Sequence, residues 1–159
     1  MNHGLKNRDE IETFGFNSRL DAIQAVVANH TLEKIDEISA SRIKNAQLYD
    51  RLLSDLEDYV LIPPRRENVK QVFHTYVVRV KERQDLINVL GSKGIETKVH
   101  YPIPIHLQEP CRKMGYTKGD LPETEKQSEE IISLPIHQYL STEQIGFVVN
   151  AIRAYYQNK

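Results

Sequence analysis

Tryptophan is absent from this 159-residue sequence, and Cys111 is its only cysteine. A single thiol cannot form an internal disulfide or a cysteine-based metal site, which suits a reducing compartment. The sequence has no apolar run long enough to cross a membrane, and its charged N-terminal stretch does not resemble a signal peptide. From these absences we expect a soluble, cytoplasmic protein without a membrane partner.

The sequence also lacks an excess of charge of either sign. It contains 21 basic and 22 acidic residues, for a net charge of −1, and the two signs are mixed along the chain. Because there is no basic block or arginine-rich tract, nucleic acid is not favoured as a partner. Hydrophobic residues make up 40% of the chain and charged residues 27%. These proportions are typical of a soluble globular domain with a core.

The common catalytic and phosphate-binding motifs are missing as well. No serine stands in a glycine elbow and Cys111 stands in no nucleophile motif, so we interpret Cys111 as a small, half-buried loop residue. The spacing of His74, His100 and His106 matches no metal signature, and we predict no metal site. A glycine-rich phosphate loop is also absent, and the chain is not expected to bind a nucleotide phosphate alone.

Apolar residues at three- and four-residue spacing predict helices, and alternating β-branched or aromatic residues predict strands. The predicted helices lie at residues 20–28, 31–57, 83–91 and 122–131, with a final helix opened by a capping box of Ser141 and Gln144. The predicted strands lie at residues 72–81, 95–99 and 133–136, and the predicted loops at 1–16 and 100–120. The strand–helix–strand run from 72 to 99 indicates an α/β domain, a small sheet packed with helices.

The predicted helix at residues 20–28 is apolar on nearly every face. Its apolar positions are Leu20, Ala22, Ile23, Ala25, Val26, Val27 and Ala28. A helix that is apolar all round is normally buried. Because this one lies at the edge of a small domain, the pattern predicts contact with protein outside this chain.

Residues 100–108, HYPIPIHLQ, form a loop with an unusual density of rings and prolines. Prolines restrict the unfolded chain, so they fix such a loop at low entropic cost. The residues alone leave two interpretations open. The segment is either an ordinary proline-rich surface loop or one wall of a ligand pocket, with imidazoles and a phenol aimed at a polar substrate.

Six segments stand in a fixed order along the chain: NHG at 2–4, GFNSRLDAIQA at 15–25, FHTYVVRV at 73–80, KGIETKVHYPIPIHLQ at 93–108, GYTKGDLPETEK at 115–126 and SLPIHQYLSTEQI at 133–145. In wording and spacing they resemble the carboxy-terminal part of the DegT/StrS family of sugar aminotransferases. The resemblance implies an α+β small domain, the carboxy-terminal domain of a fold-type I aminotransferase that uses pyridoxal 5′-phosphate (PLP). It also implies transfer of an amino group, usually from glutamate, to a nucleotide-linked keto sugar in polysaccharide or antibiotic sugar biosynthesis.

The same resemblance implies that this chain holds only part of the enzyme. The family's Schiff-base lysine lies upstream of the NHG segment, whereas Lys6 follows it. We therefore expect no catalytic residue here. Residues 1–30 would belong with a missing large domain that binds most of the PLP, and residues 31–159 would form the small domain. The resemblance implies a homodimer for the intact enzyme.

The resemblance assigns Asn17 to the PLP phosphate of the other subunit, where its amide would donate a hydrogen bond without adding charge. From the residue alone Asn17 is a helix N-cap, and the two roles can coexist because a helix start favours an anion. For Arg19 the alternatives are support of the same phosphate-binding corner, a contact with an acidic group at the dimer interface, and a solvated surface arginine. The implied nucleotide-sugar contacts are His3, His100, Tyr101 and His106, and Asn2 is an implied interface residue.

Two other functions stay open from the sequence. One is a relative of the same family that dehydrates a sugar or acts as a regulator. The other is a stand-alone, non-catalytic binding or interaction module from a truncated or split gene.

Overall fold

The structure, a computed structural model, describes residues 4–16 and 20–157. The chain forms two compact units, Met1–His30 with His100–Glu129, and Thr31–Val99 with Glu130–Lys159. Residues 100–129 thus group with the N-terminal segment. The domain boundary after residue 30 stays a prediction. The assignment of residues 1–30 to a larger domain stays a prediction.

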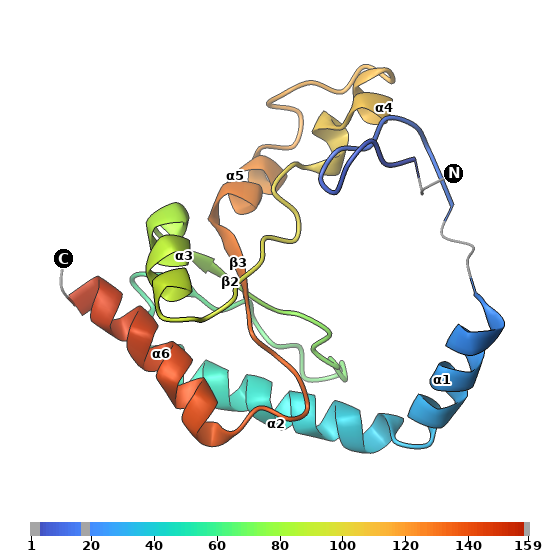
Figure 1. Cartoon of the computed structure of the whole chain (residues 1–159). Helices are drawn as coiled ribbons and strands as arrows, with labels where there is room; N and C mark the ends of the chain where they lie inside the picture. Colours follow the sequence, from blue (N-terminus) through green and yellow to red (C-terminus); the bar gives the residue numbers. More distant parts are fainter. Residues whose placement is uncertain (1–3, 17–19, 158–159) are drawn as a thin grey trace. The chain divides into compact units, whose positions relative to one another are not determined.

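The second unit contains an antiparallel sheet in the order β1-β2-β3 (Figure 1). The strands are β1 (Val60–Leu61), β2 (Tyr76–Val80) and β3 (Ile131–Leu134). The predicted strand at 95–99 was wrong as a continuous strand, since only an antiparallel bridge from Lys98 to Ser133 is present there. Strand β2 and the segment at Lys98 lie on opposite sides of β3, and both pair with it in the antiparallel direction at Ser133. The two are therefore parallel to each other, as in a split β–α–β unit.

Strand β2 begins four residues later than predicted. Phe73 has a φ of +49°, in the left-handed region, and this turn interrupts the extended chain. As a result Phe73 is buried and His74 is exposed, the reverse of the predicted alternation. From Tyr76 onward the alternation is confirmed, because Tyr76, Val78 and Val80 all face the core.

The observed helices are α1 (Ala22–Leu32), α2 (Ile35–Leu53), α3 (Arg83–Ser92), α4 (Glu109–Arg112), α5 (Pro122–Glu130) and α6 (Thr142–Gln157). Helices α3 and α5 match their predictions within a residue. The predicted helix at 31–57 was wrong at both ends, because α2 starts only at Ile35 and a 3₁₀ turn, Ser54–Leu56, follows it. The predicted loop at 100–120 also contains α4 and a 3₁₀ turn, Ile105–Leu107.

The capping box of the last helix is confirmed in both directions. The backbone N–H of Ser141 donates to Gln144 Oε1 at 3.0 Å, and the N–H of Gln144 donates to Ser141 Oγ at 3.2 Å. Two backbone donors at the start of α6 are therefore satisfied by side chains, which fixes where this helix begins.

The core of the second unit lies between the sheet and three helices. Figure 1 shows α6 running alongside α2, with α3 against it on the other side, and these two pairs make the main helix contacts. Among the largest fully buried side chains are Leu53, Leu86, Leu90, Ile132, Ile145 and Ile152. Burial of a side chain of this size contributes roughly 1.5–3 kcal/mol, so this layer supplies most of the stability of the unit.

One residue of the predicted α2 stripe is charged, and the structure explains it. Arg42 Nη1 donates to the backbone carbonyls of Phe73 (3.0 Å), His74 (3.3 Å) and Ile136 (3.3 Å). One guanidinium thus holds the turn before β2 and the segment after β3 against the same helix. The buried stripe starts at Ser39, whereas the more N-terminal residues that we had assigned to it, Leu32 and Ile35, are exposed.

Helix α1 overlaps the predicted helix at 20–28 but begins at Ala22 and continues to Leu32, and none of its residues is buried. The side chains of Ile23, Val26 and Val27 are 79%, 69% and 60% exposed. These three side chains are thus largely exposed in the described part of the chain, and the predicted contact with other protein stays a prediction. None of the helices in the described parts of the chain has both the length and the apolar character needed to span a bilayer.

Two stacked tyrosines in the core differ in how their hydroxyls are satisfied. The rings of Tyr49 and Tyr76 stack with centroids 4.8 Å apart. Tyr76 Oη donates to Asp50 Oδ1 at 2.7 Å, whereas Tyr49 Oη is buried without a hydrogen-bond partner in the described part of the chain. Burial raises the pKa of both hydroxyls, so both are neutral at physiological pH.

This difference predicts opposite effects for the same substitution. Tyr49→Phe removes an unpaired buried hydroxyl and should raise the free energy of unfolding by about 1 kcal/mol. Tyr76→Phe removes a hydrogen bond to a carboxylate and should lower it by about 2 kcal/mol. Urea unfolding followed by far-UV circular dichroism measures both. Two changes of the same sign would contradict this account.

Candidate functional site

The structure describes three of the predicted site residues, all in the first unit. These are His100, Tyr101 and His106, within the loop of residues 100–108. The other predicted site residues lie outside the described residues, namely Asn2, His3, Asn17 and Arg19. The described part of the candidate site therefore consists of the 100–108 loop and the segments that hold it.

The first two residues of this loop lie together. The rings of His100 and Tyr101 meet edge to face, with centroids 5.5 Å apart. His100 is half-buried, whereas the phenol of Tyr101 is 68% exposed. This pair thus presents an imidazole and a phenol at the surface of the first unit, where a polar ligand could reach the phenol.

His106 has a different environment, because only 3% of it is exposed. Its Nε2 lies 2.9 Å from Glu125 Oε1, and the same oxygen accepts a hydrogen bond from the backbone N–H of Gly119 at 2.7 Å. The hydrogen bond with His106 makes the largest contribution to holding the pKa of Glu125 below its usual value, and the hydrogen bond from Gly119 makes the next largest. His106 therefore ties the loop to α5, and its assignment as a direct substrate contact stays a prediction.

Gln108, the last residue of the loop, is buried and was missed by the sequence analysis. Its Nε2 donates to the carbonyl of Asp9 at 2.8 Å, and its Oε1 accepts the N–H of Ile11 at 3.0 Å. Both ends of the amide are therefore bonded to the backbone of the N-terminal segment. The only available signal was its place at the end of HYPIPIHLQ, and that gave no indication of its partners.

The N-terminal segment that Gln108 holds is more ordered than the loop that we predicted there. Residues 4–13, called the N-terminal hairpin below, are closed by a bridge between Leu5 and Ile11. Asn7 Oδ1 accepts the N–H groups of Asp9 and Glu10 at 3.0 and 2.9 Å. The carbonyl of Gly4 accepts the N–H groups of Glu12 and Thr13 at 2.9 and 3.2 Å.

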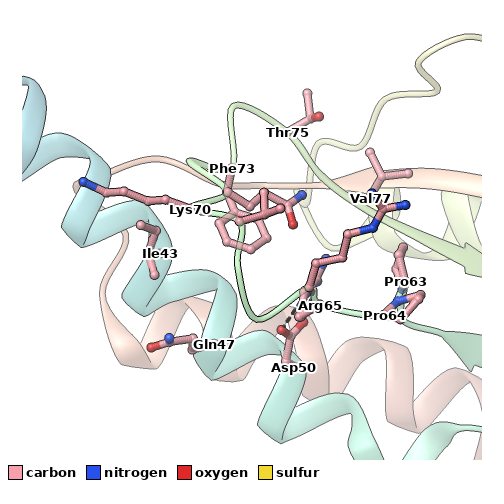
Figure 2. A pocket seen from close by; sticks show the side chains of 13 residues that line it. Ile43, Gln47, Asp50, Pro63, Pro64, Arg65, Lys70, Phe73, Thr75 and Val77 are labelled. Atoms are coloured by element: carbon pink, nitrogen blue, oxygen red, sulfur yellow. Dashed lines mark hydrogen bonds and ion pairs between the residues drawn. The ribbon is translucent and has the colours of Figure 1, made fainter.

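A pocket of about 650 Å³ lies in the second unit, between α2, the loop at 63–71 and the start of β2 (Figure 2). Arg65 Nε and Nη2 donate to the two oxygens of Asp50 at 2.9 and 2.7 Å, and its guanidinium lies 5.0 Å from the centroid of the Phe73 ring. Arg65 and Asp50 therefore neutralise each other beside apolar walls. This arrangement stabilises the loop and leaves Arg65 poorly suited to recruiting an anion.

The described residues contain no group of three His, Cys, Asp or Glu side chains placed to hold a metal ion. Cys111 is half-buried, as predicted, but it lies in the short helix α4 and not in a loop.

Comparison with known proteins places the chain in a family. The sequence profile of the DegT/DnrJ/EryC1/StrS aminotransferase family matches residues 1–153. The chain is 38% identical over 157 residues to the pleiotropic regulatory protein of Geobacillus stearothermophilus, covering 98% of this chain and 42% of that protein. It is 33% identical over 152 residues to a dTDP-3-amino-3,4,6-trideoxy-alpha-D-glucose transaminase of Streptomyces venezuelae, covering 96% and 40%.

Its fold is also similar to that of a solved transaminase structure. The crystal structure of S. venezuelae DesV in complex with a ketimine intermediate superimposes with a TM-score of 0.80 and 32% identity, over 97% of this chain and 41% of that one. Similar structures are thus fold-type I sugar aminotransferases, and the predicted fold class is confirmed. The chain belongs to the DegT/DnrJ/EryC1/StrS aminotransferase family. It spans about 40% of the length of the curated relatives it matches.

Proposed function

We propose that these residues are the carboxy-terminal part of a PLP-dependent aminotransferase that transfers an amino group from glutamate to a nucleotide-linked keto sugar. The observation that carries the proposal is the match to DesV, which combines fold and sequence similarity over nearly the whole chain. The intact enzyme would be a homodimer. In it, this part would bind substrate and complete the partner subunit's cofactor site.

The proposal gives the residues of this chain two tasks. Asn17 would donate a hydrogen bond to the PLP phosphate of the other subunit, and His100 and Tyr101 would contact the nucleotide sugar. PLP supplies the electron sink for the chemistry when it is bound. The residues of this chain would orient the cofactor and the sugar. His3 and His106 would also contact the nucleotide sugar, and Asn2 and Arg19 would lie at the subunit interface.

The lysines of this chain support the expectation that covalent cofactor binding belongs to another segment. A lysine that forms a Schiff base is normally desolvated, which lowers its pKa. Every described lysine is exposed instead. Lys113, for example, lies 2.8 Å from Glu109, and this hydrogen bond raises its pKa. A residue in that state remains protonated and is a poor nucleophile.

A second candidate is a regulatory member of the family. It is favoured by the similarity to the regulatory protein of G. stearothermophilus, which at 38% exceeds the identity to the transaminase of S. venezuelae. An intact protein that binds PLP but does not turn over amino donor and keto sugar would support this candidate over the transaminase.

The test uses the intact protein that carries this segment. With PLP, glutamate and a dTDP- or UDP-linked keto sugar, mass spectrometry should detect the aminated sugar. Asn17→Ala should weaken PLP binding on the order of tenfold, because a hydrogen bond to a charged group contributes about 1.5–3 kcal/mol. His100→Ala should raise the KM for the sugar nucleotide more than the KM for glutamate. Unchanged PLP affinity would remove Asn17 from the phosphate site, and equal KM changes would argue against sugar binding by His100.

A further inference from the structure

We propose that Gln108 is a positioning residue. It holds the N-terminal hairpin in place and thereby sets the positions of the two segments on either side of that hairpin. This inference rests on the proposed function, because those two segments, NHG and GFN, are the ones assigned to the active site. Gln108 itself would touch neither cofactor nor substrate.

The geometry supports a lock with two points of attachment. Gln108 is 7% exposed, and its amide donates to Asp9 O and accepts from Ile11 N–H. Because both hydrogen bonds come from one planar amide, they fix the distance of the hairpin from Gln108 and also its rotation relative to that amide. Asp9 is exposed and Ile11 is half-buried, so water can replace these two hydrogen bonds, but it cannot hold the hairpin at the fixed position that Gln108 gives it.

The position of the lock in the chain gives it a role beyond local stability. The hairpin starts at Gly4, the last residue of NHG, and ends two residues before GFN begins at Gly15. Internal bonds from Asn7 and Gly4 make the hairpin one stiff piece. A shift of the hairpin would therefore move the described ends of these segments, Gly4 on one side and residues 15–16 on the other. Gln108 also ends the loop that starts with His100, so one side chain links the regions assigned to cofactor and sugar.

The neighbours of Gln108 make contacts of another kind. His106 bonds to Glu125 on α5. Glu109 and Lys113 attract Lys6 and Glu12 of the hairpin as charges, without the fixed geometry of the Gln108 amide. A leucine at position 108 would fill nearly the same volume but would offer neither hydrogen bond. A glutamate would retain the acceptor for Ile11 N–H but would place a carboxylate oxygen against the carbonyl of Asp9. These two substitutions thus separate packing from hydrogen bonding.

The experiment compares Gln108→Leu and Gln108→Glu with a matched control, Gln127→Leu, in the intact PLP enzyme. Gln127 is an exposed glutamine of α5 whose Nε2 donates to Glu123 Oε1 at 3.0 Å. Hydrogen exchange of the Ile11 amide reports the lock directly. Gln108→Leu should accelerate it roughly tenfold, as expected for the loss of about one net hydrogen bond. Gln108→Glu should accelerate it less, because it keeps the acceptor for Ile11 N–H and loses the bond to Asp9 O, and the control should leave it unchanged.

The functional measurements are the dissociation constant of PLP, the KM of the sugar nucleotide and kcat at saturating ligands. For each variant, the changes in the first two are set against the change in kcat. A positioning role predicts that PLP binding weakens several-fold in both Gln108 variants while kcat at saturating ligands changes little. At a pH low enough to protonate the new carboxyl group, Gln108→Glu regains a donor for Asp9 O. The loss of PLP affinity in Gln108→Glu, measured relative to Gln127→Glu at the same pH, should then become smaller.

Two outcomes would overturn the inference. If exchange at Ile11 is unchanged, the lock does not exist. If exchange accelerates but PLP and sugar binding keep their wild-type values while Asn17→Ala weakens PLP binding, Gln108 only stabilises the hairpin. Failure of the proposed function looks different, because Asn17→Ala and the Gln108 variants would then all leave PLP affinity unchanged, whereas exchange would still respond to Gln108.

Discussion

Replacing Arg42 by alanine should lower the free energy of unfolding of the second unit by about 3 kcal/mol. The guanidinium donates to three carbonyls, of Phe73, His74 and Ile136, which come from segments before β2 and after β3. Alanine leaves these carbonyls without this donor. Urea unfolding followed by the near-UV circular dichroism of the buried tyrosines measures the loss.

Two further variants show whether the three-way contact causes the effect. Arg42→Lys keeps the charge, but an ammonium group has no planar fork, so it should recover only part of the stability. Arg51→Ala removes an exposed arginine of the same helix and should change stability by less than about 0.5 kcal/mol. Equal losses for Arg42→Ala and Arg51→Ala would mean that the carbonyl contacts contribute nothing measurable.

Replacing Gly4 by alanine should open the N-terminal hairpin. A Cβ atom at this position would lie 1.9 Å from the carbonyl oxygen of Thr13, and the φ of Gly4 is +78°. Because the obstructing atom belongs to the backbone, the hairpin must shift as a whole, at a cost on the order of 3 kcal/mol or more. The amides of Glu12 and Thr13, which donate to the Gly4 carbonyl, should then exchange at close to unprotected rates.

Gly94 offers a control with nearly the same backbone angle. Its φ is +75°, but a Cβ there would meet nothing within 4 Å. Gly94→Ala should therefore show only the left-handed penalty, about 1 kcal/mol, and should leave hydrogen exchange in the hairpin unchanged. Preserved protection of Glu12 and Thr13 in Gly4→Ala would mean that the hairpin tolerates a side chain at this position.

The parts of the fold that sequence could predict are those fixed by near neighbours. Ser141 and Gln144 are three residues apart, so the start of α6 was readable from the sequence. The short strand β1 was not predicted, because two residues carry no periodicity and Val60 is extended only through pairing with Val80. The left-handed turn at Phe73 was hidden for a similar reason, since the contacts that hold it come from Arg42 on another element.

The candidate site shows the same limit more sharply. The loop at 100–108 was identifiable because its proline and histidine pattern is local. Gln108 was not, because its partners lie 97 and 99 residues away and an isolated glutamine has no spacing to interpret. His106 was assigned to substrate from the same local pattern, although its bond to Glu125 on α5 could not be read from it.

The exposed apolar surface of α1 also affects how the protein behaves in the test tube. Ile23, Val26 and Val27 expose most of their side chains on a single helix. Contiguous apolar surface of this kind promotes self-association and precipitation when nothing covers it. The 159-residue chain purified alone should therefore scatter light increasingly as its concentration rises. Its shelf life and monodispersity thus depend on those three side chains as much as on the stability of its core.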